Sequence, residues 1–230
     1  MERLHTIMPA AGRGLRLGAG MNKMYVKIGA LPVLICALKA LNACPSCETV
    51  TIAAVPEELT RVQELLEEYR EFFPRLACSV TPGGKTRQDS VRNALRQLPA
   101  DCGFVAVHDG ARPLITAALF ENVLARARKT GAAIAAASVN DTVKFVRNNL
   151  IESTADRAHI MFAQTPQIFS RKILEDAYAK AEKDGFSGTD DASLVENIGY
   201  RVTVAAGDPD NIKITTSMDV FLAEKMLGVQ

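Results

Sequence analysis

Aromatic residues are scarce in this chain, which has no tryptophan and only 6% aromatic residues in total. Proteins that hold unpaired bases usually stack them on aromatic rings, so a base bound here would be recognised mainly by backbone groups. The formal net charge is only +1, whereas surfaces that bind nucleic acids are strongly basic. We therefore expect no nucleic-acid partner.

Long apolar runs are also missing. No run approaches the length of a membrane span, and the apolar run near the N-terminus is too short for a signal peptide. The five cysteines are odd in number and scattered along the chain, a pattern typical of free thiols in a reducing compartment. These absences predict a cytoplasmic protein with no membrane partner.

Cys44 and Cys47 form a CxxC motif. In redox proteins this motif normally opens a helix, where the helix dipole lowers the thiol pKa. Here it follows a helical pattern and precedes a strand-like run, and no second pair of cysteines or histidines lies at the spacing of a zinc site. We interpret both thiols as structural.

The 230 residues, 48% of them hydrophobic, suffice for a core without disulfides, and we expect one domain over 1–230. Strand-like runs alternate with helix-like runs, which predicts βαβ units, a mainly parallel sheet covered on both faces and an α/β fold. The strands are expected at 4–8, 49–55, 76–82, 103–110, 132–139 and 201–206. The helices are expected at 32–41, 56–73, 86–98, 116–131, 171–185, 189–199 and 217–227, with Thr189 and Ser217 capping the last two.

The segment at about 143–162 breaks this alternation. It holds two short β-prone pieces around Asn148-Asn149, a pair typical of a tight hairpin turn. We expect a β-hairpin arm that leaves the core and needs a partner to cover it.

A glycine-rich stretch with Arg16 and Lys23 and without acidic residues, 9–25, follows the first strand. In a parallel α/β sheet, ligands bind at the carboxyl ends of the strands. Glycines there let backbone N–H groups approach an anion, and the two cations add the charge that a triphosphate requires.

Two common nucleotide motifs do not fit this stretch. The Walker pattern is absent, and Gly12, Gly14 and Gly18 form GxGxxxG, one residue longer than the dinucleotide fingerprint. A longer loop that wraps a nucleoside triphosphate remains, with a plain surface loop as the alternative.

Polar residues also lie at the ends of the later strands. Asp109 is placed to hold Mg²⁺ together with phosphates, and Arg112 beside it is placed to clamp a phosphate; the alternative is a turn aspartate. His108 faces the other side of the strand, so we expect a structural histidine. Lys213 lies in a strand-like run, 211–215, at the same edge.

The Gly83-Gly84 turn offers backbone groups that could recognise a base edge, and Ser90 could reach the base or ribose from the start of the next helix. A plain strand-to-helix turn is the alternative. We find no Ser-His-Asp or Cys-His constellation.

The chain resembles the 2-C-methyl-D-erythritol 4-phosphate cytidylyltransferase family over nearly its full length. The resemblance is carried by PAAGRGLRLG, NKMY, GGKTRQDSV, VHDGARP, DTVK, DRAHIMFAQTPQIF, TDDAS and GDPDNIKIT, in that order. It implies a three-layer Rossmann-like nucleotidyltransferase fold, transfer of CMP from CTP to methylerythritol 4-phosphate, and a divalent metal, Mg²⁺. It also implies a homodimer in which the arm is exchanged.

The resemblance further implies roles for individual residues. The CTP loop would comprise Ala10, Ala11, Gly12, Gly14, Arg16 and Lys23, and Gly84 and Ser90 would contact cytosine and ribose. The residues at methylerythritol phosphate would be Asp109, Arg112, Thr142, Arg157, Thr165 and Lys213, with Asp109 also at the metal and Arg157 supplied by the partner subunit. The catalytic cations would be Arg16, Lys23 and Lys213.

Two departures from the family pattern stand out. The chain has Asn22-Lys23-Met24-Tyr25 where the family often has Pro-Lys-Gln-Tyr, and Gly110 where the family often has alanine. Three rival hypotheses are a cytidylyltransferase for ribitol 5-phosphate or a related sugar-alcohol phosphate, a redox dinucleotide-binding domain, and a non-catalytic nucleotide-binding module.

Overall fold

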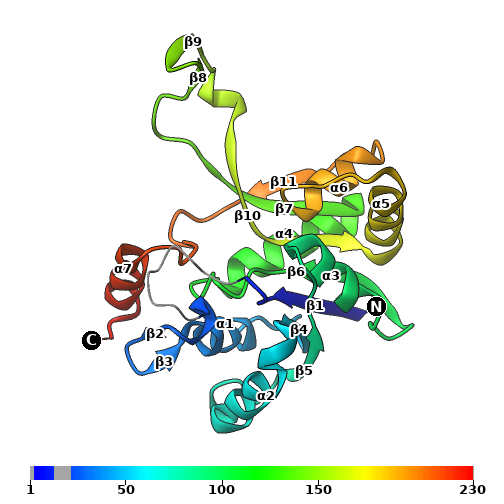
Figure 1. Cartoon of the computed structure of the whole chain (residues 1–230), viewed down its shortest axis with the longest axis vertical. Helices are drawn as coiled ribbons and strands as arrows, with labels where there is room; N and C mark the ends of the chain where they lie inside the picture. Colours follow the sequence, from blue (N-terminus) through cyan, green and yellow to red (C-terminus); the bar gives the residue numbers. More distant parts are fainter. Residues whose placement is uncertain (1–2, 13–21, 230) are drawn as a thin grey trace.

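The computed structural model describes residues 3–12 and 22–229. Its centre is a seven-stranded sheet in the order β11-β7-β10-β6-β1-β4-β5 (Figure 1). The strands are β1 (Arg3–Pro9), β4 (Thr49–Ala54), β5 (Ala77–Pro82), β6 (Cys102–Val107), β7 (Ala132–Ser138), β10 (Met161–Ser170) and β11 (Thr203–Ala206). All neighbouring pairs are parallel except those of β10, which runs antiparallel to β6 and β7.

Helices cover both faces of this sheet. They are α1 (Val33–Asn42), α2 (Leu59–Glu68), α3 (Arg87–Leu95), α4 (Ala117–Thr130), α5 (Arg171–Asp184) and α6 (Asp191–Asn197). A further helix, α7 (Ser217–Leu227), packs outside the sheet, where its Ala223 joins a small cluster with Ile28 and Val33. Met8 of β1 packs in one core cluster with α1, α2 and α4, while its neighbour Ile7 packs in another with α3, α5 and α6. Because successive side chains of a strand point to opposite faces, the fold has three layers. The predicted α/β class is confirmed.

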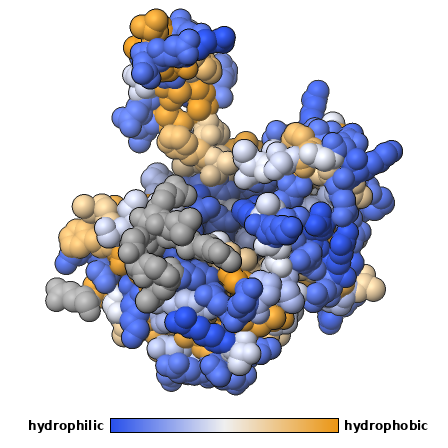
Figure 2. All heavy atoms as spheres, viewed as in Figure 1, coloured by the Kyte–Doolittle hydropathy of each residue, from blue (hydrophilic) through white to orange (hydrophobic). Residues whose placement is uncertain are grey.

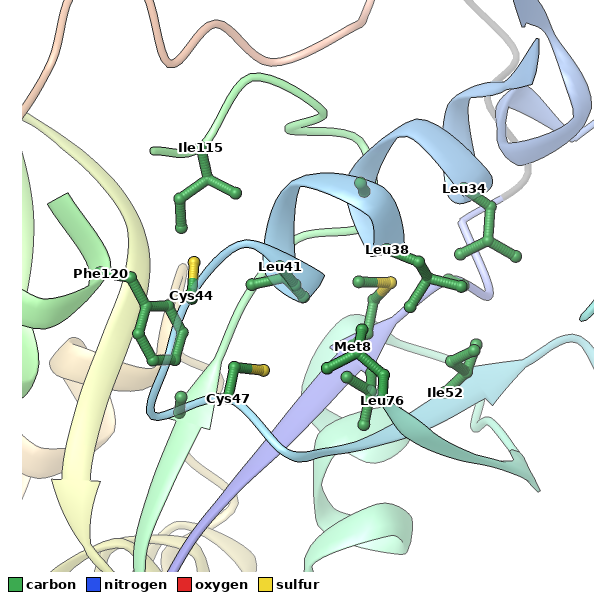
Figure 3. Close-up of a cluster of buried hydrophobic side chains, with 14 of the residues drawn as sticks. Met8, Leu34, Leu38, Leu41, Cys44, Cys47, Ile52, Leu76, Ile115 and Phe120 are labelled. Carbon is green, nitrogen blue, oxygen red and sulfur yellow. The ribbon is translucent and has the colours of Figure 1, made fainter. Parts of the chain in front are cut away.

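The CxxC motif lies inside the first of these clusters, where Figure 3 shows Cys44 and Cys47 among Leu41, Ile115 and Phe120. Burial raises the pKa of each of the two thiols to about 12. All five cysteines are free. Thiols that stay protonated are poor nucleophiles, so these two are structural, as predicted.

Strand β10 was not predicted from the sequence. It begins at Met161, at the base of the arm, and its register against β7 shifts between Ala163 and Gln167. Pro166 lies in that interval and has no N–H to donate to a ladder. The sequence pattern is broken at the point where the strand is irregular, which explains why the strand was missed.

Three further expectations were wrong in detail. Helix α6 is capped by Asp190 rather than Thr189, and α7 by Thr216 rather than Ser217, each through a capping box. No strand forms over 211–215. Instead, the side chain of Ile214 is buried against Ala223 of α7, which explains the apolar pattern there.

The predicted hairpin is present as β8 (Lys144–Arg147) and β9 (Leu150–Thr154), which project away from the body (Figure 1). Asn148 and Asn149 have φ of 50° and 63°, the left-handed conformations of a type I′ turn. Figure 2 shows apolar side chains gathered on this arm. The exposed large apolar residues there are Phe145, Val146, Leu150, Ile151, Met161 and Phe162.

Over the described residues, no helix combines the length and the apolar character needed to cross a bilayer.

Candidate active site

A cleft of about 760 Å³ lies at the carboxyl ends of β1, β4, β5 and β6. This is the edge at which open parallel sheets bind ligands. Its lining includes eight of the predicted site residues, Ala10, Ala11, Gly12, Lys23, Gly84, Ser90, Asp109 and Lys213. Gly14 and Arg16 lie outside the described residues.

The Gly83-Gly84 turn forms one wall of the cleft. The buried hydroxyl of Ser90 accepts a hydrogen bond from the Gly84 N–H at 3.0 Å and donates one to the Thr86 carbonyl at 2.8 Å. A Cβ atom on Gly84 would lie 2.2 Å from Cβ of Asp89, so no side chain fits there. This wall therefore presents backbone atoms, held in place by Ser90.

The two departures from the family pattern touch each other. A Cβ atom on Gly110 would lie 3.0 Å from Sδ of Met24 and 3.2 Å from Sδ of Met8. Met24 is buried and lines the cleft next to Lys23. Because Gly110 has no side chain, the thioether of Met24 can lie close to its backbone; an alanine there would crowd the sulfur atom.

Asp109 follows β6 and places a buried carboxylate in the cleft. Its Oδ1 accepts from Nε of Arg87 at 3.1 Å, and its Oδ2 accepts from Nζ of Lys213 at 2.5 Å. Burial alone would raise the pKa of the Asp109 carboxyl, but the charges of Arg87 and Lys213 outweigh burial and hold this pKa well below its usual range. The carboxylate is therefore ionised and held between two cations.

Arg87 is a residue that the sequence reasoning missed. Its Nη1 donates to Oδ2 of Asp191 at 2.8 Å, and the Tyr178 hydroxyl donates to Oδ1 of the same carboxylate at 2.5 Å. Burial alone would lower the pKa of Arg87. The carboxylates of Asp191 and Asp109 raise it by more than burial lowers it, so the net shift is upward. In the sequence, Arg87 is recognisable only as the first residue of α3, directly after the capping residue Thr86. That position does not indicate that Arg87 pairs with the carboxylates of Asp109 and Asp191.

His108 is buried behind this group, as predicted. Burial lowers its pKa to about 4, so the ring is neutral at pH 7. Its Nε2 lies 3.1 Å from the Arg112 carbonyl, which can only accept, so Nε2 carries the proton. Nδ1 then accepts from the Thr165 hydroxyl, whose oxygen accepts the Asp109 N–H at 3.0 Å. His108 thus orients the loop that carries Asp109.

The other predicted residues that the structure describes do not line this cleft. Arg112 donates from Nη1 to the Asn211 carbonyl at 2.5 Å, and burial lowers its pKa. Thr165 is buried in the contacts above. Thr142 is exposed at the base of the arm, and Arg157 donates to the Asn140 carbonyl at 2.5 Å.

Asp109 is the residue of the cleft that the sequence predicted at a divalent metal. Within 3–12 and 22–229, no three His, Cys, Asp or Glu side chains cluster as a metal site would require. Mg²⁺, however, is commonly bound by one or two carboxylates together with phosphates. Each oxygen of Asp109 accepts one hydrogen bond and retains a further lone pair, so this carboxylate fits such a role.

Comparisons with known proteins agree over the length of the chain. The family model of 2-C-methyl-D-erythritol 4-phosphate cytidylyltransferase matches residues 4–229. An enzyme of that name from Bacillus cereus is 42% identical over 224 residues, which is 97% of each chain. One from Lysinibacillus sphaericus is 41% identical over 221 residues, 96% of this chain and 94% of that protein.

Solved structures show the same agreement in three dimensions. The 4-diphosphocytidyl-2C-methyl-D-erythritol synthase of Anaerococcus prevotii matches with a TM-score of 0.85 and 28% identity, over 99% of both chains. The 2-C-methyl-D-erythritol 4-phosphate cytidylyltransferase of Thermus thermophilus matches with a TM-score of 0.80 and 30% identity, over 99% of this chain and 100% of that one.

Proposed function

The chain belongs to the 2-C-methyl-D-erythritol 4-phosphate cytidylyltransferase family, and from this premise we propose how its cleft performs the reaction. It is a nucleotidyltransferase that transfers a cytidylyl group from CTP to methylerythritol phosphate. The observation that carries the proposal is the ion cluster of Lys213, Asp109 and Arg87 in the cleft, facing the same space as Lys23. We propose that the cytosine lies against the Gly83-Gly84 wall and the triphosphate lies toward Lys23.

The nucleophile is an oxygen of the acceptor's phosphate monoester. The second pKa of such a group is about 6, so it is largely ionised at pH 7 and needs no general base. It attacks the α-phosphorus of CTP in line. A bond forms between the acceptor oxygen and the α-phosphorus, and the bond from that phosphorus to the oxygen that bridges it to the β-phosphorus breaks. The products are 4-diphosphocytidyl-2-C-methyl-D-erythritol and pyrophosphate.

The work of the protein is therefore electrostatic. Two polyanions have to be brought together, and charge that develops on the transferred phosphate and the leaving pyrophosphate has to be stabilised by fixed cations. We assign this role to Arg16, Lys23 and Lys213. Members of the family generally use a divalent metal; we propose Mg²⁺ held by Asp109 and the phosphates, where it would neutralise phosphate charge.

Pyrophosphate release is the test of this function. With CTP, Mg²⁺ and methylerythritol 4-phosphate, the protein is expected to release one pyrophosphate per acceptor consumed, and ribitol 5-phosphate offered in parallel is expected to give none. Continuous detection of pyrophosphate measures both. Release only with ribitol 5-phosphate would keep the mechanism and overturn the acceptor, and release with neither would overturn the assigned activity.

We further propose that residues 1–230 form one domain, whose arm at 143–162 joins two copies of the chain into a homodimer. The arm exposes large apolar side chains, including Phe145, Leu150 and Phe162, and exposed patches of this kind mark interaction sites. In such a dimer Arg157, which lies outside the cleft of its own protomer, would serve the cleft of the partner.

Mixed dimers test this exchange. A heterodimer of Arg157→Ala and Lys213→Ala subunits, isolated with two different affinity tags, is expected to keep about half of the wild-type activity, because one of its two sites has both side chains. Each homodimeric variant, prepared identically, is the control. If Arg157 acts within its own subunit, both sites of the heterodimer are defective and activity stays at the level of the controls. A chain that is monomeric by light scattering would contradict the proposal directly.

We propose that the enzyme works in the cytoplasm. Its five cysteines are all free, as is usual for proteins of a reducing compartment.

A further inference from the structure

Asn22 makes an unusually complete set of side-chain contacts beside the cleft. It is buried, and its Oδ1 accepts the Met24 N–H at 3.2 Å. The two hydrogens of its amide go to different acceptors, the Ala10 carbonyl at 3.3 Å and Oε2 of Glu58 at 2.9 Å. The side chain therefore ties its own segment to two others.

Glu58 also binds the segment 22–25 at a residue that follows Lys23 in the sequence. Its Oε2 also accepts from the hydroxyl of Tyr25 at 3.2 Å, and the guanidinium of Arg61 lies 3.8 Å from the centre of the Tyr25 ring. Burial, and then the Glu58 charge, raises the pKa of Tyr25 to about 12, so the phenol remains a donor at physiological pH. The residues on both sides of Lys23 are thus bound to one carboxylate.

The three segments joined in this way are three walls of the cleft. Ala10 follows β1, Lys23 opens the short 3-10 helix Lys23–Tyr25, and Glu57, next to Glu58, lies in the 3-10 helix Pro56–Glu58. Ala10, Lys23 and Glu57 all line the cleft. A shift of the Lys23 backbone would break buried hydrogen bonds at both neighbouring residues, which is costly because the groups left behind would be unsatisfied.

We propose that Asn22 and Glu58 are positioning residues for Lys23, acting as a clamp that fixes its backbone against the end of β1. This rests on the role proposed above for Lys23. Neither Asn22 nor Glu58 lines the cleft, so their influence on the reaction passes through the segment that they hold. Small displacements of a group that stabilises a transition state lower the rate steeply.

The test is a double-mutant cycle with Lys23. Asn22→Ala is expected to lower kcat/KM for CTP about 10- to 100-fold in the wild-type protein. In the Lys23→Ala protein the same change is expected to lower it by less than about twofold, because there is no longer a lysine to position. Pyrophosphate release at varied CTP gives kcat and KM for all four proteins, and thermal unfolding monitors their stability.

Asn42→Ala is the matched control. Asn42 also accepts a backbone N–H through its side chain, that of Arg75 at 2.9 Å, but it lies away from the cleft. Its loss is expected to affect thermal stability without changing kcat/KM for CTP. If Asn22→Ala does not fold, Glu58→Gln, which keeps the size and an acceptor oxygen, replaces it in the cycle with an expected loss of about 3- to 10-fold.

The outcomes separate the clamp from the proposed function. Equal losses from Asn22→Ala with and without Lys23, or no loss in the wild-type background, would overturn the clamp. A fully active Lys23→Ala protein would remove the proposed role of Lys23, and the clamp with it, while leaving the overall reaction in place. If the wild-type protein releases no pyrophosphate, the proposed function is wrong. The clamp is then tested by measuring CTP binding calorimetrically for the same four proteins of the double-mutant cycle.

Discussion

Replacing Lys213 by alanine is expected to lower kcat about 10²- to 10³-fold, the loss seen when a fixed donor to a developing negative charge is removed. Nζ of Lys213 lies 2.5 Å from Oδ2 of Asp109, in the cleft. An ammonium group at this position is fixed before the substrate arrives, so it stabilises the transition state without reorganisation. Steady-state pyrophosphate release measures the loss.

The fold should survive this change. Asp109 keeps its contact with Nε of Arg87, so the carboxylate is not left unpaired, and thermal unfolding is expected to stay close to that of the wild type. Lys213→Arg retains the charge on a differently shaped head group and is expected to recover only part of the rate. Lys225→Ala, on the exposed face of α7, is the matched control and should have full activity. A Lys213→Ala enzyme with wild-type kcat would remove Lys213 from the mechanism.

Replacing Arg87 by glutamine is expected to have two effects. Unfolding free energy should fall by about 3 kcal/mol, because the fully buried carboxylate of Asp191 loses its ion-pair partner. Turnover should fall about 100-fold as well, because Asp109 loses one of the two cations that orient it. Chemical denaturation measures the first effect, and pyrophosphate release measures the second.

A second substitution separates the two effects. In the Arg87→Gln, Asp191→Asn protein the buried charge is gone, so much of the lost stability should return while turnover stays low. Arg92→Gln is the matched control on the same helix: its ion pairs with Asp89 and Glu182 are partly exposed, so about 1 kcal/mol or less should be lost. If turnover recovers together with stability in the double variant, Arg87 contributes only to the stability of the fold and not to turnover.

The alternation of apolar runs was sufficient to predict the layers of the fold. Ile7 and Met8 are adjacent in the sequence and pack on opposite faces of the sheet, which is the behaviour that a continuously apolar strand implies. The Asn148-Asn149 pair likewise specified the hairpin, since a tight turn of that type needs residues that tolerate positive φ. The faces of a strand and the type of a hairpin turn depend on residues that are close in the sequence, so short sequence patterns predict them.

Other features depended on which segments meet. Strand β10 runs antiparallel between β6 and β7. The pattern of its own residues is interrupted by Pro166, and it predicts neither the neighbouring strands nor the direction of the strand. The run 211–215 looked like a strand because Ile214 is buried against α7, and burial by a helix leaves the same apolar pattern as burial in a sheet.

For the site, the sequence by itself placed Ala10 and Gly84 just after strands and Asp109 at the end of one, and the parallel-sheet rule brought them to one edge. Only the tertiary structure decided that Arg87 lies between Asp109 and Asp191, and that Asn22 and Glu58 hold the residues beside Lys23. The physical reason is that a strand end is determined by neighbours in the chain. An ion pair or a shared hydrogen bond is determined by the packing of distant segments, which short-range pattern does not encode.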